Sequence, residues 1–201
     1  MKITAIVGSY RKGGMIEQAV DEILTAARDE GAETAKIHLL YKNIEFCRNC
    51  RACTQQEGPN RGKCPLDDEM GALLDELEAS DAIVIASPMN FGTVTALMKR
   101  FLERLVCFAY WKWGMMAPKV RNKEKRKRAV VVAASAAPAI LSRLSSKMVG
   151  LMEHAAGLLG AKPIGVLFIG MAAREQRQEI GAGTRQKARR LGKKLAADNR
   201  I

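Results

Sequence analysis

Four of the five cysteines crowd into one segment of the chain. Cys47, Cys50 and Cys53 follow one another at steps of three, and Cys64 closes the segment. If the backbone curls around one centre, these residues supply the four thiolates that an iron–sulfur cluster or a zinc ion needs. Cys107 lies in an apolar helical stretch and is interpreted as a core residue. The segment therefore predicts a metal or redox site, with plain thiols as the alternative.

The length and composition of the chain predict one domain. Its 201 residues, 48% of them hydrophobic, are enough for one buried core and too few for two. We expect this single domain to span residues 1–201, with a cysteine-rich loop at 43–66 and a long connection at 108–128.

The chain shows neither a membrane span nor a secretory signal. No stretch approaches the roughly 18 uncharged apolar residues that cross a bilayer, and the apolar N-terminus is interrupted after residue 7. We therefore expect a cytoplasmic protein. In that reducing compartment, clustered cysteines are more often metal-binding or redox-active than disulfide-bonded.

The chain is strongly basic, with a formal net charge of +12 and a pI near 9.7. Lysine and arginine gather in residues 119–128 and in the C-terminal helical stretch. Such a run usually forms a solvated face; an anionic cofactor, a partner subunit or nucleic acid are the functional alternatives. No nucleic-acid-binding motif accompanies these residues, so we expect no nucleic-acid partner.

Short apolar strands alternate with amphipathic helices along the chain. Strands this continuously apolar are buried on both faces, and strict alternation implies a parallel sheet with right-handed crossovers. The pattern predicts an α/β fold, a flavodoxin-like doubly wound five-stranded parallel sheet in the order 2-1-3-4-5. Asp67 is the expected N-cap of the second helix. The expected strands are 2–7, 36–40, 82–86, 129–134 and 163–169, and the expected helices are 14–30, 67–79, 92–107, 141–159 and 172–197.

This topology predicts which loops bind a ligand. In an open parallel sheet, ligands bind outside the carboxyl ends of the strands. The segments that follow strands are 8–14, 43–65, 87–92 and 134–138. The basic run 119–128 precedes a strand, so we expect it at the opposite edge unless the long connection reaches a neighbouring subunit.

The first of these segments turns from a strand into a helix with glycines, a hydroxyl and two cations. Exposed backbone N–H groups and the positive helix N-terminus bind phosphate in such turns, and a plain turn is the alternative. The turn is neither the GxGxxG fingerprint nor a Walker loop, which argues against NAD held in the Rossmann manner and against ATP. The residues expected to bind the phosphate are Ser9, Arg11, Lys12, Gly13 and Gly14.

Three motifs, in the same order along the chain, resemble the NADPH-dependent FMN reductase superfamily. Within it, the chain is most similar to the iron–sulfur flavoproteins and their multimeric flavodoxin-like relatives. The resemblance runs from residue 1 to about 105; beyond that it rests on the alternation of strands and helices. The motifs are residues 8–14, the cysteine run with Asp67, Asp68, Glu69 and Met70, and residues 80–92 followed by Leu97, Lys99, Phe101 and Arg104.

The resemblance implies two cofactor sites. FMN would place its phosphate in the first turn, its ring and ribityl chain against the third strand end, and the other side of the ring against the fourth strand end. A 4Fe–4S cluster would lie beside the flavin. The implied residues are Pro88, Met89, Asn90, Phe91 and Gly92 for the ring and ribityl chain, Ser135 and Ala136 for the other side, and Cys47, Cys50, Cys53 and Cys64 for the cluster.

The chain departs from the family pattern at several positions. Tyr10 stands where proline is usual, Met15-Ile16 stands where a polar pair is usual, and Asn90 stands where tyrosine is common. Phosphate hydrogen bonds are thereby lost, and more of the binding is expected to fall to the cations of the turn. Ten residues separate the last two cysteines, a longer gap than in cluster-binding members.

The function implied by the resemblance is an NAD(P)H-dependent FMN reductase-like oxidoreductase. It would pass electrons between NAD(P)H or a ferredoxin and a quinone, a flavin, oxygen or a protein, with NADPH as a possible donor. The alternative is a zinc- or thiol-containing binding module on a flavodoxin scaffold, whose basic face engages nucleic acid or an acidic protein.

Several other side chains have expected roles. Arg48 and Arg51 would offset the negative charge of a cluster, with solubility as the alternative, whereas Lys99 and Arg104 are expected to be solvated. No side-chain acid or base is expected to be essential, and both histidines, His38 and His154, are expected to be structural. The aromatic stretch Phe108, Tyr110, Trp111 and Trp113 predicts a subunit interface or a cover over the flavin of a neighbouring subunit, and hence a homodimer or homotetramer.

Overall fold

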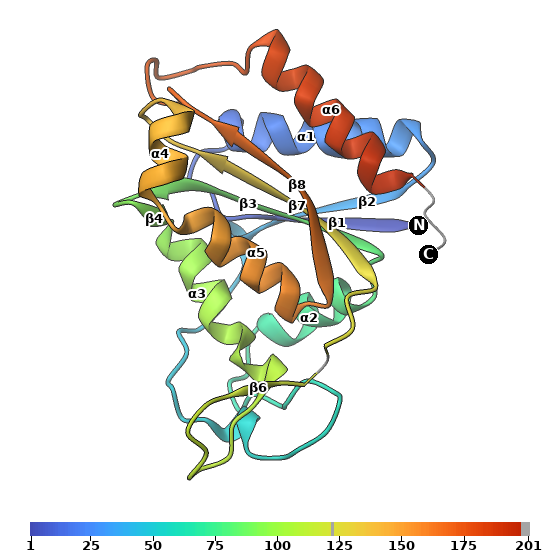
Figure 1. The fold of residues 1–201 in the computed structure, drawn as a ribbon, viewed down its shortest axis with the longest axis vertical. Helices are drawn as coiled ribbons and strands as arrows, with labels where there is room; N and C mark the ends of the chain where they lie inside the picture. The colour runs from blue at the N-terminus through green and yellow to red at the C-terminus, as the bar shows by residue number, and fades with distance from the viewer. Residues whose placement is uncertain (122, 198–201) are drawn as a thin grey trace.

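The computed structural model describes residues 1–121 and 123–197. Five parallel strands form the central sheet in the order β2-β1-β3-β7-β8, which confirms the predicted doubly wound topology (Figure 1). A short antiparallel strand, β4 (Thr93–Val94), extends the pairing of β3 beyond its carboxyl end. The strands are β1 (Lys2–Val7), β2 (Glu33–His38), β3 (Ala82–Asn90), β7 (Lys127–Ala134) and β8 (Ala161–Ile169).

Helices cover both faces of the sheet because successive strand residues point to opposite sides. Ile3 and Val84 belong to the core under α1 (Met15–Asp29) and α6 (Ala182–Ala196), whereas Ile6 and Ile83 belong to the core on the other face. That second core also contains residues of α2 (Met70–Glu78), α3 (Ala96–Arg104) and α5 (Met148–Leu158). None of the described helices is both long and apolar enough to cross a membrane.

Two expected helices depart most from the structure. The helix expected at 141–159 is divided into α4 (Ala139–Ser145) and α5, because Ser146 is extended and its hydroxyl both donates to the Gly92 carbonyl and accepts from Met148 N–H. The helix expected at 172–197 begins only at Ala182, after an irregular segment that starts with Met171 at a φ of 56°.

The helix expected at 67–79 begins at Met70, so Asp67 is not its N-cap. Asp68 instead accepts a hydrogen bond from Met70 N–H and directs its carboxylate toward Arg104 of α3. The second strand also begins three residues earlier than expected, and α3 begins at Ala96, where Thr95 caps it by accepting from Met98 N–H.

The cysteine segment and the long connection form a lobe beside the sheet, below it in Figure 1. Trp111 N–H donates to the Thr54 carbonyl, and Gly62 N–H donates to the Cys107 carbonyl. The connection contributes two short strands, β5 (Ala109–Tyr110) and β6 (Lys119–Val120). We expected residues 119–128 at the opposite edge of the sheet from the predicted ligand loops. This is wrong for the start of the run, because β6 lies in the same lobe as the cysteine segment. Residue 122 lies outside the described part of the chain.

Candidate functional site

The carboxyl ends of the strands surround a cavity of about 1130 Å³. Its volume slightly exceeds the roughly 300–1,000 Å³ typical of small-molecule sites. Three segments that the sequence predicted contribute to its wall, because parallel strands end at one edge. They are the loops after β1 and β7 and the last residues of β3, which continues to Asn90 where the sequence predicted a strand end at residue 86. The predicted residues that line it are Ser9, Arg11, Lys12, Gly13, Gly14, Pro88, Met89, Asn90, Ser135 and Ala136.

Two predicted residues lie outside this cavity. Phe91 is fully exposed and has a φ of 47°, and Gly92 follows with a φ of 75°. These values form the tight turn between β3 and β4, and the Gly92 carbonyl accepts a hydrogen bond from Ser146. The turn therefore directs Phe91 into solvent.

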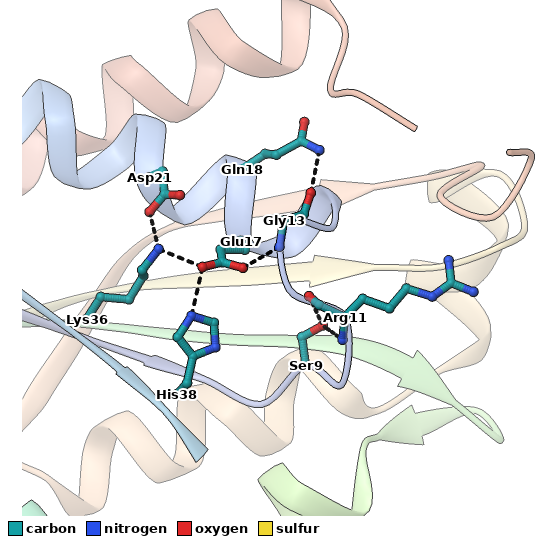
Figure 2. A network of polar contacts seen from close by, with 8 residues as sticks. All are labelled: Ser9, Arg11, Gly13, Glu17, Gln18, Asp21, Lys36 and His38. Carbon is teal, nitrogen blue, oxygen red and sulfur yellow. Dashed lines mark hydrogen bonds and ion pairs between the residues drawn. The ribbon is translucent and has the colours of Figure 1, made fainter. Parts of the chain in front are cut away.

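Residues 8–14, predicted to bind a phosphate and called the phosphate-type turn below, are held by hydrogen bonds within the turn. The Ser9 hydroxyl accepts from Arg11 N–H at 3.1 Å, and Gly13 has a φ of 69°, a left-handed conformation that glycine adopts without strain. The side chains of Arg11 and Lys12 are exposed at the cavity wall. Figure 2 shows the Arg11 guanidinium directed away from the turn, where it is free to meet an anion.

The sequence analysis did not single out Glu17, although it lies directly behind this turn. Its carboxylate accepts from Gly13 N–H at 2.5 Å, and it contacts Lys36 Nζ and His38 Nε2 at 2.8 Å each (Figure 2). Burial alone would raise the pKa of Glu17, but the bonds from Lys36, Gly13 and His38 outweigh it and lower the pKa to about 2. An acidic residue in the first turn of α1 was the available sequence signal.

Glu17 is expected to make the fold sensitive to acid. Because its pKa falls from 4.5 to about 2 on folding, its contribution is present above pH 4.5 and is lost as the pH falls toward 2. At 1.36 kcal/mol per pKa unit, the contribution is about 3 kcal/mol. Urea unfolding of wild type and Glu17→Gln should show a gap in stability at pH 7 that closes between pH 4.5 and 2. A gap independent of pH would contradict this assignment.

A fourth loop, which the sequence analysis predicted as helix, also lines the cavity. Residues 172–179 contribute most of their side chains to its wall. Gln18 of α1 holds this loop, donating to the Gln178 carbonyl at 3.1 Å and accepting from Ile180 N–H at 3.0 Å. The first turn of α1 therefore positions two sides of the cavity at once.

The four clustered cysteines line a second cavity, of about 180 Å³. All four are free thiols, and burial together with the neighbouring cysteines raises the pKa of Cys53. Within residues 1–121 and 123–197, no three His, Cys, Asp or Glu side chains are close enough to hold one metal ion. Cys47, Cys50, Cys53 and Cys64 therefore share one cavity, and their role as metal ligands stays a prediction.

The expectation that Arg104 is solvated is wrong. Its side chain is 3% exposed, and its guanidinium bonds both carboxylate oxygens of Asp68, at 2.5 and 3.1 Å. Nη2 also lies 3.6 Å from Cys64 Sγ. Burial alone would raise the pKa of Asp68, but the bond from Arg104, the backbone N–H donors of Glu45 and Met70 and the charge of Arg104 together outweigh it and lower the pKa. Lys99 on the same helix is half exposed, as predicted.

A stacked arginine supports the cysteine cavity from another side. The Arg51 guanidinium lies 3.8 Å from the ring centre of Trp111 and 4.1 Å from that of Trp113, and Nη2 donates to the Trp111 carbonyl. Its Nε is buried, and no hydrogen-bond acceptor is found for it in the described structure. The two tryptophans predicted for a subunit interface therefore contact the cysteine segment of their own chain.

The sequence of this chain is similar to those of iron–sulfur flavoproteins. The chain is 34% identical over 110 residues to an iron–sulfur flavoprotein of Archaeoglobus fulgidus, covering 55% of this chain and 48% of that protein. The chain thus spans about half the length of the curated relatives it matches.

Solved structures show the same fold. An FMN-dependent NADH-azoreductase from Bacillus anthracis, in complex with FMN, superposes with a TM-score of 0.72 at 12% identity, covering 98% of this chain and 100% of that chain. An archaeal flavodoxin superposes with a TM-score of 0.57 at 12% identity, covering 98% of this chain and 96% of that chain. The flavodoxin-like fold is therefore confirmed. Because the family model of NADPH-dependent FMN reductase matches residues 1–173, the chain belongs to the NADPH-dependent FMN reductase family.

Proposed function

We propose that the protein is an FMN-dependent oxidoreductase that passes electrons between NAD(P)H or a ferredoxin and a quinone, flavin, oxygen or protein acceptor. The observation that carries the proposal is the large cavity at the carboxyl ends of β1, β3 and β7, with a glycine turn and two cations on one wall. The family assignment and the names of its relatives support it.

The residues of this cavity fit FMN. Ser9, Gly13 and the first turn of α1 present a helix N-terminus, while Arg11 and Lys12 supply positive charge for a phosphate. Pro88 and Met89 offer an apolar wall for a planar ring. When bound, FMN supplies hydride acceptance and one-electron transfer. The protein's part is to bind the phosphate, orient the ring and leave one side of the cavity open to a second reactant.

We further propose that Cys47, Cys50, Cys53 and Cys64 hold a 4Fe–4S cluster. The donor set is four free thiols around one cavity, and the buried Arg51 Nε is a donor that an anionic cluster environment would satisfy. The relatives named iron–sulfur flavoproteins support this assignment. A cluster there would supply one-electron storage. We retain the cytoplasm as the proposed location, because free clustered thiols suit a reducing compartment.

An anaerobic absorption spectrum before and after NADPH, with iron and acid-labile sulfide measured on the same sample, tests both proposals. Flavin bands with a broad shoulder near 400 nm and about four irons per chain are expected. Flavin without iron would overturn the cluster alone. No colour after FMN is added would overturn the flavoprotein, and salt-sensitive retention on nucleic acid would then favour the binding-module alternative.

Serine at one cysteine is expected to remove the cluster and leave the flavin. Cys50 is exposed at the mouth of the cavity, so Cys50→Ser removes a thiolate with little effect on packing. We expect at least a several-fold loss of iron per chain with FMN content unchanged.

The matched control is Cys107→Ala. Cys107 is buried and does not line the cavity, and burial raises its pKa to about 12, which keeps it protonated. This variant should retain its iron. Equal iron content in Cys50→Ser and wild type would contradict the ligand assignment.

We also propose that the protein forms a homodimer or homotetramer. The described part of the chain exposes apolar side chains of α4, with Ile140 75%, Leu141 62% and Leu144 82% exposed. Exposed apolar residues gathered on one short helix favour an interface. Light scattering at micromolar concentration tests this, and a monomeric mass would overturn it.

A further inference from the structure

Glu17 lies outside the large cavity although its neighbours line it. Gly13, Gly14, Met15, Ile16 and Gln18 all contribute to the cavity wall, whereas the Glu17 side chain is 8% exposed and points from α1 toward β2 (Figure 2). Glu17 therefore contacts the phosphate-type turn from behind and leaves the cavity side to a ligand.

The Gly13 residue of that turn is held on both of its polar groups. Its N–H donates to Glu17 Oε2 at 2.5 Å, and its carbonyl accepts from Gln18 Nε2 at 2.8 Å. Gly13 has a φ of 69°, so neighbouring conformations are open to it without steric cost. The two side chains therefore select one conformation of a residue that is intrinsically free.

The negative charge of Glu17 is balanced locally. Lys36 Nζ lies 2.8 Å from Oε1 and is shared with Asp21 at 2.6 Å, and His38 Nε2 lies 2.8 Å from the same Oε1. A buried carboxylate paired in this way repels an incoming phosphate less than a free one would. Arg11 and Lys12 remain exposed at the cavity wall to meet the ligand.

We propose that Glu17 is a positioning residue that preforms the phosphate-binding turn and so sets the preference of this protein for FMN over riboflavin. The inference rests on the proposed flavin site. Without an acceptor for Gly13 N–H, the turn takes several conformations and must be ordered when the phosphate binds. The free energy of that ordering weakens the binding of FMN, whose phosphate occupies the turn. Because riboflavin has no phosphate to seat in the turn, its affinity is insensitive to the change.

The test is fluorescence titration of the apoprotein with FMN and with riboflavin for wild type, Glu17→Ala, Glu17→Gln and Asp21→Asn. We expect Glu17→Ala to weaken FMN binding by about tenfold or more, and riboflavin binding by less than about twofold, because Gly13 N–H then loses its charged acceptor. Glu17→Gln retains an acceptor for Gly13 N–H and should recover part of the FMN preference. Asp21→Asn, which contacts Lys36 but not the turn, should leave the preference unchanged.

Three outcomes would overturn the inference. Tighter FMN binding by Glu17→Ala would mean that the carboxylate repels the phosphate, and equal weakening of both flavins would mean general structural damage. A preference in Glu17→Gln equal to that in Glu17→Ala, with both variants folded by circular dichroism, would exclude the acceptor role. If wild type binds neither flavin, the proposed function fails instead.

Discussion

Arg104→Gln is expected to lower the free energy of unfolding by about 3–5 kcal/mol. The Arg104 and Asp68 side chains are only 3% and 1% exposed, so removing the guanidinium leaves a buried carboxylate without its cation. The same change removes the donors to Cys64 Sγ and to the Glu45 carbonyl. Urea unfolding of the apoprotein measures the loss of stability, and iron per chain should also fall.

Lys99→Gln is the matched control for Arg104→Gln. Lys99 lies on the same helix and pairs with Glu103 at 3.2 Å, but both side chains are about half exposed. A surface pair of this kind contributes roughly 0–1 kcal/mol. Asp68→Asn in the Arg104→Gln background should recover part of the stability, because it removes the unpaired buried charge. A loss below about 1 kcal/mol in Arg104→Gln would show that this pair does not hold the cysteine lobe.

Gly62→Ala is expected to disrupt the cysteine cavity. A β-carbon on Gly62 would overlap the carbonyl group of Cys53, and it would lie 3.1 Å from the Arg121 Nη2 that donates to that carbonyl. Gly62 N–H also donates to the Cys107 carbonyl at 2.8 Å, which restricts its movement. Because the overlap is with backbone, the segment must shift, at a cost of roughly 1–3 kcal/mol or more. Iron per chain and urea unfolding both measure the effect.

Gly71→Ala is the opposite case. Gly71 lies inside α2, is exposed, and would place a β-carbon where no atom lies within 4 Å. Alanine should therefore stabilise the fold by about 0.5–1 kcal/mol through helix propensity.

Wild-type stability and iron content in Gly62→Ala would refute the close approach of Gly62 to Cys53.

The sheet was predictable because its signals are local. The first strand was predicted at its observed bounds, Lys2–Val7, since a short apolar run with turn residues behind it is a strand in most contexts. The order of the five strands follows from alternation with helices and right-handed crossovers. The turn residues and the four cysteines were found for the same reason, as their spacing is readable within about twenty residues of sequence.

The helix boundaries were less predictable. Residues 172–181 have helical composition, yet they form the fourth loop of the large cavity, held by Gln18 some 160 residues away. The division between α4 and α5 depends on the contact of Ser146 with Gly92, which is 54 residues away. Tertiary hydrogen bonds decided these boundaries, because helix propensity differs by only fractions of a kcal/mol per residue.

The sequence by itself therefore determined the fold, the clustering of four cysteines and three of the segments that line the large cavity. Only the tertiary structure decided what the charged residues do. A charge is solvated unless a partner is buried with it. Lys36 lies 19 residues from Glu17, Asp68 lies 36 residues from Arg104, and Trp111 lies 60 residues from Arg51. Strand register and crossovers bring these partners together, and no local pattern encodes such a meeting.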